Sequence, residues 1–126
     1  MARFLLVCMA GAAGTGVRYL VGLAAARLIG TGFPWGTLAV NVVGCLLMSI
    51  VAEAGTRTII SHETRVVLAT GFMGGLTTYS AYNWETIAMA RDGAWTLGVV
   101  YATSTFVACV TSGLAGLVIA RAAFGN

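Results

Sequence analysis

Four long stretches of apolar residues make up most of the chain, and short segments that hold most of the charge separate them. Three of these stretches, 33–52, 66–84 and 93–120, contain no charged residue, and the fourth, 5–26, is interrupted only by Arg18. A helix needs roughly 20 residues to cross about 30 Å of hydrocarbon. The pattern therefore predicts four transmembrane helices, with both ends of the chain on the same side of the membrane.

The composition agrees with a membrane location, because 59% of the residues are hydrophobic and only 9% are charged. Soluble domains carry about 25% charged residues. The basic residues are all arginines and are scattered, so no basic patch indicates a nucleic-acid partner. Cys8, Cys45 and Cys109 lie in apolar stretches without CxxC spacing, which favours packing roles. We expect a single domain, 1–126, embedded in a lipid bilayer.

The arginines are divided almost evenly between the two sides of the predicted bundle. One side carries Arg3, Arg57, Arg65 and Arg121. The other side carries Arg27 and Arg91, and also Arg18 if its side chain snorkels outward, so the division is four against two or three. This is a weak bias under the positive-inside rule. A chain with so weak a bias can insert in both orientations, and two opposed copies would form an antiparallel dimer.

One face of the first predicted helix carries Gly11, Gly14, Arg18 and Gly22. Such glycines let helix backbones approach closely, so the stripe favours assembly between subunits, although close packing alone also explains most of the 17 glycines. An unpaired arginine at this depth costs at least about 2.5 kcal/mol. Arg18 therefore either snorkels to the interface, clamps the structure or creates an electropositive vestibule suited to an anion.

In the second predicted helix, Thr37, Asn41 and Gly44 share one face. The amide of Asn41 lies at membrane depth, where it is costly unless it meets another polar group or water. Asn41 therefore either forms a hydrogen bond between helices or lines an aqueous path.

The third predicted helix contains the pair Gly74-Gly75, which is followed by Leu76, Thr77 and Thr78. Two glycines followed by β-branched residues make a poor helix, so we expect a break in the middle of the span. Backbone groups freed by a break are tolerated in a membrane only inside protein or along a cavity. Freed carbonyls can bind a cation, and freed N–H groups attract anions.

Further polar and aromatic side chains follow at helical spacing. Tyr79 and Tyr82 share one face, with Glu85 one turn beyond, and aromatic ring edges are electropositive enough to face an anion. The fourth helix presents a track of hydroxyl groups and a thiol: Tyr101, Thr105, Cys109 and Ser112, with Ser104 beside them. These hydroxyls either bond to carbonyls of their own helix or replace water around a dehydrating ion.

These segments together resemble the CrcB/Fluc family of fluoride channels over essentially the whole chain. The resemblance is carried by Gly11-Ala12-Ala13-Gly14 with Arg18-Tyr19, by Pro34-Trp35-Gly36-Thr37-Leu38 with Asn41, and by Gly71-Phe72 with Gly74-Gly75-Leu76-Thr77-Thr78. It implies an all-α membrane protein with four transmembrane helices per subunit, the third broken mid-membrane. It also implies an antiparallel dual-topology homodimer with two pores, whose partner is an identical subunit in the opposite orientation.

The resemblance implies a structural Na⁺ on the dimer two-fold axis, held by the backbone carbonyls of Gly74 and Thr77 from both subunits. It assigns to the ion pore Thr37, Asn41, Tyr79, Tyr82, Glu85, Tyr101, Thr105 and Cys109, with Arg18 in a vestibule or structural role. One departure is clear, because the family usually has phenylalanine where this chain has Tyr79 and Tyr82. A cysteine at position 109, in a track where hydroxyls are usual, is a smaller departure.

The implied function is passive, selective export of fluoride across the cytoplasmic (inner) membrane, which protects the cell from fluoride toxicity. The sequence contains no nucleotide motif and no nucleophile–base set, so we do not expect an enzyme. A small dual-topology multidrug exporter is the alternative, but it needs an acidic residue in the first helix, where this chain has Arg18. A structural subunit of a larger complex would leave Arg18, Asn41 and the helix break unexplained.

Overall fold

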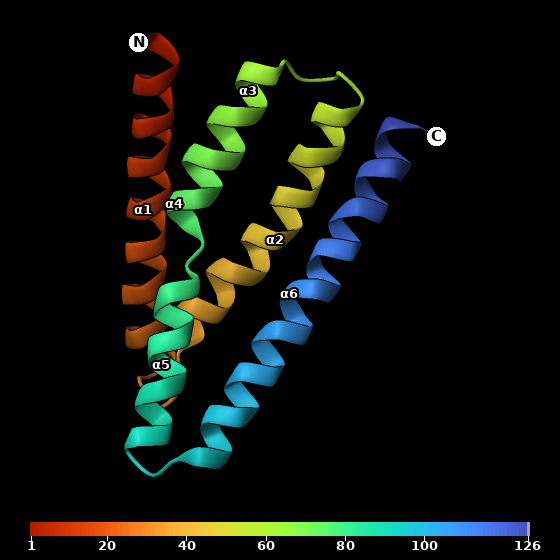
Figure 1. Cartoon of the computed structure of the whole chain (residues 1–126). Helices are drawn as coiled ribbons and strands as arrows, with labels where there is room; N and C mark the ends of the chain where they lie inside the picture. Colours follow the sequence, from red (N-terminus) through yellow and green to blue (C-terminus); the bar gives the residue numbers. More distant parts are fainter. Residues whose placement is uncertain (126) are drawn as a thin grey trace.

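The computed structural model describes residues 1–125, and these residues form helices and short connections without any strand. In chain order the elements are α1 (Ala2–Leu28), α2 (Trp35–Thr56), α3 (His62–Val66), the π-helical η1 (Val67–Met73), α4 (Gly74–Leu76), α5 (Tyr79–Arg91) and α6 (Trp95–Phe124). The N-terminus, the α2–α3 connection and the C-terminal end of α6 lie at one end of the molecule (Figure 1). The α1–α2 and α5–α6 connections lie at the other end.

Three of the helices, α1, α2 and α6, are long and apolar enough to cross a membrane. Many of their large apolar side chains are exposed, including Phe4 at 66%, Leu20 at 64% and Phe106 at 67%. Such surfaces belong in lipid or against another protein. The expected third span, 66–84, is not a single helix, because it is divided among α3, η1, α4 and α5. The chain is thus an all-α, multi-pass membrane protein.

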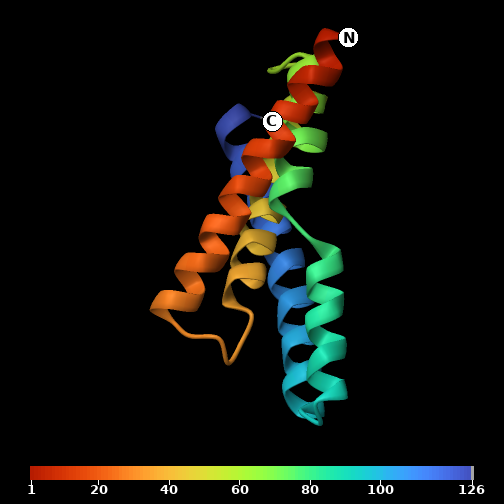
Figure 2. The same cartoon turned by 90° about the vertical axis from the view of Figure 1, so that its left-hand side faces the viewer.

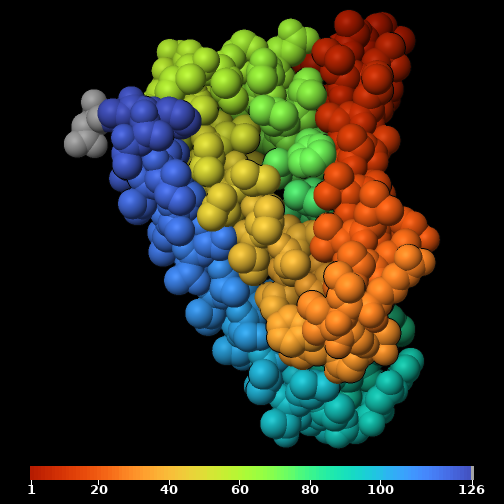
Figure 3. Space-filling model, turned by 180° about the vertical axis from the view of Figure 1, so that it is seen from behind, coloured from red at the N-terminus to blue at the C-terminus, as the bar shows by residue number. Residues whose placement is uncertain are grey.

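The helices are arranged around α2, which packs against α6 on one side and α1 on the other (Figure 3). The path through η1 and α4 runs beside α1, whereas α5 leaves α1 and follows the first half of α6 (Figure 2). Gly116 allows α6 to touch α2, because a Cβ there would collide with the carbonyl of Leu46. The hydroxyl of Ser112 adds a hydrogen bond of 2.8 Å to the carbonyl of Val42.

The glycine stripe of α1 packs inside the chain, which corrects its interpretation as a surface between subunits. A Cβ on Gly14 would collide with the carbonyl of Phe72, and one on Gly75 would collide with the carbonyl of Gly11. The two helices therefore approach through glycines on both sides. Gly22 lies against Gly36, since a Cβ on Gly36 would come within 2.8 Å of the Gly22 Cα. Close helix packing was predicted, but the partner is the same chain.

The third helical path is interrupted at Thr77 and Thr78, both of which have extended backbone conformations. The glycine pair itself is helical, with Gly74 at φ −62° and ψ −35°, so the interruption lies beyond the position that the glycines indicated. Two side chains stabilise the ends at this point. Thr77 Oγ1 donates to the carbonyl of Met73 at 2.9 Å, and Thr78 Oγ1 caps α5 by accepting from the Ala81 amide at 3.2 Å.

Candidate functional site

Asn41 holds the interruption in place from the neighbouring helix α2. Its Oδ1 accepts from the amide of Thr78 at 2.7 Å, and its Nδ2 donates to the carbonyl of the same residue at 3.1 Å. Both Asn41 and Thr78 are 8% exposed. Gly44, one turn further along α2, gives room for the methyl group of Thr77. The face of α2 that carries Asn41 and Gly44 thus packs against Thr77 and Thr78, the two residues at which the helical path is interrupted.

The interruption frees the two carbonyls that the sequence comparison singled out as cation ligands. In an unbroken helix the Thr78 amide would donate to the Gly74 carbonyl, but here it donates to Asn41. Likewise the Ala81 amide, which would donate to the Thr77 carbonyl, donates to the Thr78 hydroxyl. Gly74 is exposed, so its carbonyl lies near the surface of the chain. The carbonyls of Gly74 and Thr77 thus both lack the amide donor that a regular helix would supply.

A groove of about 680 Å³ opens beside the interruption, between α2, the start of α5 and α6. Asn41 forms the predicted hydrogen bond between helices, and it also lines this groove. The groove brings together Asn41, Tyr79, Tyr82, Thr105 and Cys109 from the predicted set, together with Thr77. The other lining residues are Gly44, Cys45, Met48, Ser49, Thr78, Phe106, Val110 and Gly113.

Thr105 is the unusual polar residue of the groove. It is 4% exposed, and its Oγ1 has no hydrogen-bond partner among the described residues 1–125. A buried hydroxyl without a partner costs about 1–3 kcal/mol, so such groups normally have one. Neighbouring hydroxyls on α6 do have partners, since Ser104 donates to the carbonyl of Tyr101 and Thr111 to that of Val107. Thr105 is therefore a polar residue of the groove lining whose buried hydroxyl the described residues leave without a partner.

Three tyrosines form a connected aromatic row next to the groove. The ring centroids of Tyr79 and Tyr82 are 5.6 Å apart, and those of Tyr82 and Tyr101 are 5.5 Å apart. The hydroxyl of Tyr82 donates to the carbonyl of Ala102 at 3.0 Å, which fixes its ring against α6. Tyr79 is 78% exposed although it lines the groove. The row thus runs from an exposed ring at the groove to a fully buried one.

Glu85, Thr37 and Tyr101 form a separate polar triad outside the groove lining. Thr37 Oγ1 donates to Glu85 Oε1 at 2.7 Å, and the Tyr101 hydroxyl donates to Glu85 Oε2 at 2.6 Å. Both hydroxyl protons therefore point at the carboxylate. The ring of Phe33 packs edge-on against Tyr101 at 5.2 Å, a contact that sequence reasoning missed. Phe33 stands in a connection before α2, where the sequence showed only the start of an apolar run.

Arg18 lines a second hollow of about 430 Å³ on the other side of the interruption, together with Thr15, Tyr19, Gly22, Leu23, Gly36, Thr37, Thr78 and Ala81. Within residues 1–125 no carboxylate forms a salt bridge with Arg18. Thr78 lines both hollows. Thr78, which Asn41 holds through two hydrogen bonds, therefore lies between the hollow lined by Arg18 and the polar groove.

Sequence reasoning also missed Cys45, Met48 and Ser49, which line the groove from α2. The spacing of Asn41, Cys45 and Ser49 at intervals of four residues placed them on one helical face. That signal was hidden because Cys45 was interpreted as a packing residue inside an apolar run.

These features define a small helical membrane protein with a polar groove beside an interrupted helix, an arrangement used by channels and transporters. The chain belongs to the CrcB family, because the family model described as "CrcB-like protein, Camphor Resistance (CrcB)" matches residues 5–117.

Individual relatives are similar over nearly their whole length. A protein of Rhizobium etli named "Fluoride-specific ion channel FluC" is 45% identical over 123 residues, which cover 97% of this chain and 98% of the relative. Proteins with the same name from an Anaeromyxobacter species and from Sorangium cellulosum are each 41% identical over 122 residues. These alignments cover 96% of this chain and 97% and 96% of the relatives. The family consists of ion channels, and the chain is not an enzyme.

Proposed function

We propose that the protein is a fluoride-selective channel that lets F⁻ leave the cell passively across the cytoplasmic membrane. The observation that carries this proposal is near-full-length similarity, at 41–45% identity, to proteins named as fluoride-specific ion channels. Fluoride that enters as neutral HF dissociates in the more alkaline interior. A channel then allows the anion to leave down its electrochemical gradient, which protects the cell.

The groove beside the interruption is the proposed conduction path. Fluoride is strongly hydrated, so a path must replace its water with donors that hold it weakly. The hydroxyl of Thr105, which has no partner within residues 1–125, is such a donor, and the ring edges of Tyr79 and Tyr82 add positive potential. Asn41 lines the path and holds Thr78 in position through both ends of its amide. Thr37 and Tyr101 act indirectly, because their protons hold Glu85. The weak donor Cys109 adds a polarisable wall to the groove.

Arg18 suits a vestibule in this proposal. Its charge lies beside Thr78 in the second hollow and has no carboxylate partner within residues 1–125. A positive charge near the path raises the local concentration of anions.

The proposed assembly is an antiparallel homodimer with two pores and the third helix broken at mid-membrane. The exposed ring of Tyr79, which lines the groove, and the exposed Gly74 of α4 support it, because both lack cover within one chain. The near balance of arginines between the two sides supports insertion in both orientations.

A central Na⁺ is proposed for the carbonyls of Gly74 and Thr77. The fit is good, because both carbonyls have lost the amide donors of a regular helix and hard oxygens suit a hard cation. Two antiparallel chains would supply four such oxygens. When bound, the ion would offset the negative ends of the freed carbonyl dipoles.

The test is efflux from liposomes that contain the purified protein, measured with a fluoride electrode. We expect rapid release of fluoride from protein-containing liposomes and none above background from empty ones. Chloride release, measured in parallel, should remain at background. Equal release of both anions would contradict selectivity, and no fluoride release would contradict the function.

A further inference from the structure

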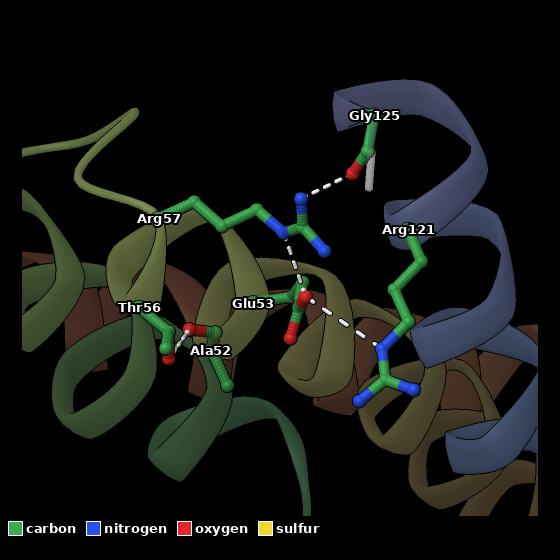
Figure 4. A network of polar contacts seen from close by, with 6 residues as sticks. All are labelled: Ala52, Glu53, Thr56, Arg57, Arg121 and Gly125. Atoms are coloured by element: carbon green, nitrogen blue, oxygen red, sulfur yellow. Dashed lines mark hydrogen bonds and ion pairs between the residues drawn. The ribbon is translucent and has the colours of Figure 1, made fainter.

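The ends of α2 and α6 carry a charged cluster in which one carboxylate faces two guanidinium groups: Glu53, Arg57 and Arg121 (Figure 4). Glu53 Oε1 accepts a hydrogen bond from Arg57 Nε at 2.7 Å and lies 3.7 Å from Arg121 Nε. A second nitrogen of Arg57 donates to the carbonyl of Gly125. The cluster has one positive charge in excess.

The two arginines are held differently. The side chain of Arg57 is 26% exposed and is fixed by both Glu53 and Gly125, so its charge mainly offsets the carboxylate. The side chain of Arg121 is 58% exposed and has only the longer contact to Glu53. The excess positive charge of the cluster is therefore presented mainly by Arg121.

Glu53 of the charged cluster lines a hollow that adjoins the polar groove. A hollow of about 340 Å³ shares Ser49, Val110 and Gly113 with the groove, and Glu53 and Thr56 line it. Polar groups thus continue along α2 from Asn41 past Ser49 to Glu53. A lone carboxylate at the end of an anion path would repel the anion, and the two guanidinium groups reverse the sign of the potential there.

We propose that Glu53, Arg57 and Arg121 form an anion-attracting mouth of the groove, in which Arg121 draws fluoride and Glu53 limits how strongly it is held. The proposal rests on the proposed function. Conduction requires binding that is favourable enough to admit an ion and weak enough to release it. A mouth with two arginines and no carboxylate would hold anions more tightly, and a mouth without Arg121 would attract them less.

Opposite charge changes provide the test. Initial fluoride efflux is measured at limiting fluoride for the parent, Arg121→Gln and Glu53→Gln in liposomes. Salt is set to about 0.01 M, where the Debye length is about 30 Å, and to about 1 M, where it is about 3 Å. At low salt we expect Arg121→Gln to lower the rate about two- to fivefold and Glu53→Gln to raise it by a similar factor. At high salt both rates should approach that of the parent.

Two further variants separate charge from structure. Arg3→Gln removes a positive charge at the same end of the molecule, on α1, which does not line the groove, and at low salt it should lower efflux less than Arg121→Gln does (Figure 1). Arg121→Lys keeps the charge and should restore the rate of the parent. The inference is overturned if both Gln variants change the rate in the same direction, if salt has no influence on their effects, or if Arg121→Lys is as slow as Arg121→Gln. A parent that does not conduct fluoride contradicts the proposed function instead.

Discussion

At the scale of single residues, the site depends on which polar groups have already found partners within the chain. Asn41 uses both ends of its amide on Thr78, and Glu85 uses both oxygens on Thr37 and Tyr101. Asn41 and Glu85 therefore hold their partner residues in fixed positions. Thr105 is different, because its buried hydroxyl is left without a partner among residues 1–125. A ligand in the groove would find its free donor there.

Replacing Thr105 by valine removes this hydroxyl and keeps the shape of the side chain. Because a buried unpartnered hydroxyl costs about 1–3 kcal/mol, we expect Thr105→Val to be as stable as the parent or more so in thermal unfolding. Fluoride efflux should nevertheless fall about tenfold, the effect of roughly 1.4 kcal/mol lost from a hydrogen bond to the ion. Thr103→Val, an exposed position on the same helix, is the matched control. Unchanged efflux in Thr105→Val would remove Thr105 from the path.

The hydroxyl of Tyr82 can be tested in the same way. Tyr82→Phe loses the hydrogen bond to the Ala102 carbonyl but keeps the ring and its positive edge. We expect conduction to survive with an altered rate or fluoride affinity, measured from efflux over a range of fluoride concentrations. Tyr79→Phe serves for comparison, because the ring of Tyr79 is 78% exposed. Efflux identical to that of the parent at all concentrations would make the Tyr82 hydroxyl irrelevant.

At the scale of helices, close packing of α1 against η1 and α4 holds the interrupted path in position. Gly14 and Gly75 lie where a Cβ would meet backbone atoms of the opposite helix. Backbone cannot move aside as a side chain can, so the glycines at these two positions are required.

Gly14 and Gly16, which are two residues apart on α1, provide a controlled comparison. A Cβ on Gly14 would collide with the carbonyl of Phe72, whereas one on Gly16 has nothing within 4 Å. We expect Gly14→Ala to destabilise the protein by about 1–3 kcal/mol through overpacking. Gly16→Ala should be neutral or stabilising by up to about 1 kcal/mol, because alanine favours the helix. Thermal unfolding in detergent measures both, and equal effects would contradict the packing argument.

At the scale of the whole molecule, the proposed antiparallel dimer accounts for two features that a single chain leaves exposed. The groove has an exposed aromatic ring at its edge, and the freed carbonyls lie near an exposed glycine. An opposed second copy would cover both features at once. This assembly requires that copies insert in both orientations.

Insertion in both orientations can be measured with a reporter thiol. In a variant whose three native cysteines are replaced by serine, Ser61→Cys places a thiol in the exposed connection between α2 and α3. Because the arginine bias is weak, about half of the copies should react with a membrane-impermeant reagent applied from outside. Labelling after detergent treatment gives the total number of copies, against which the externally labelled fraction is calculated. Labelling of all copies or of none would contradict the antiparallel dimer.

The membrane class, the limits of α1, α2 and α6 within a few residues, and the family could all be predicted from the sequence. These features depend on local quantities, namely the length of apolar runs and the spacing of particular residues along one helix. Asn41 could be predicted to need a polar partner for the same reason, since the cost of a bare amide does not depend on the details of the fold.

Which partners these residues take depends on the packing of whole helices. The glycine pair Gly74-Gly75 is helical, with Gly75 packed against α1, and the interruption falls at Thr77 and Thr78, where Asn41 of α2 bonds to the amide and the carbonyl of Thr78. The sequence placed Glu85 beyond the tyrosine pair, but its partners, Thr37 and Tyr101, come from two other helices. Contacts between segments distant in sequence depend on how whole helices pack, and no local pattern contains that information.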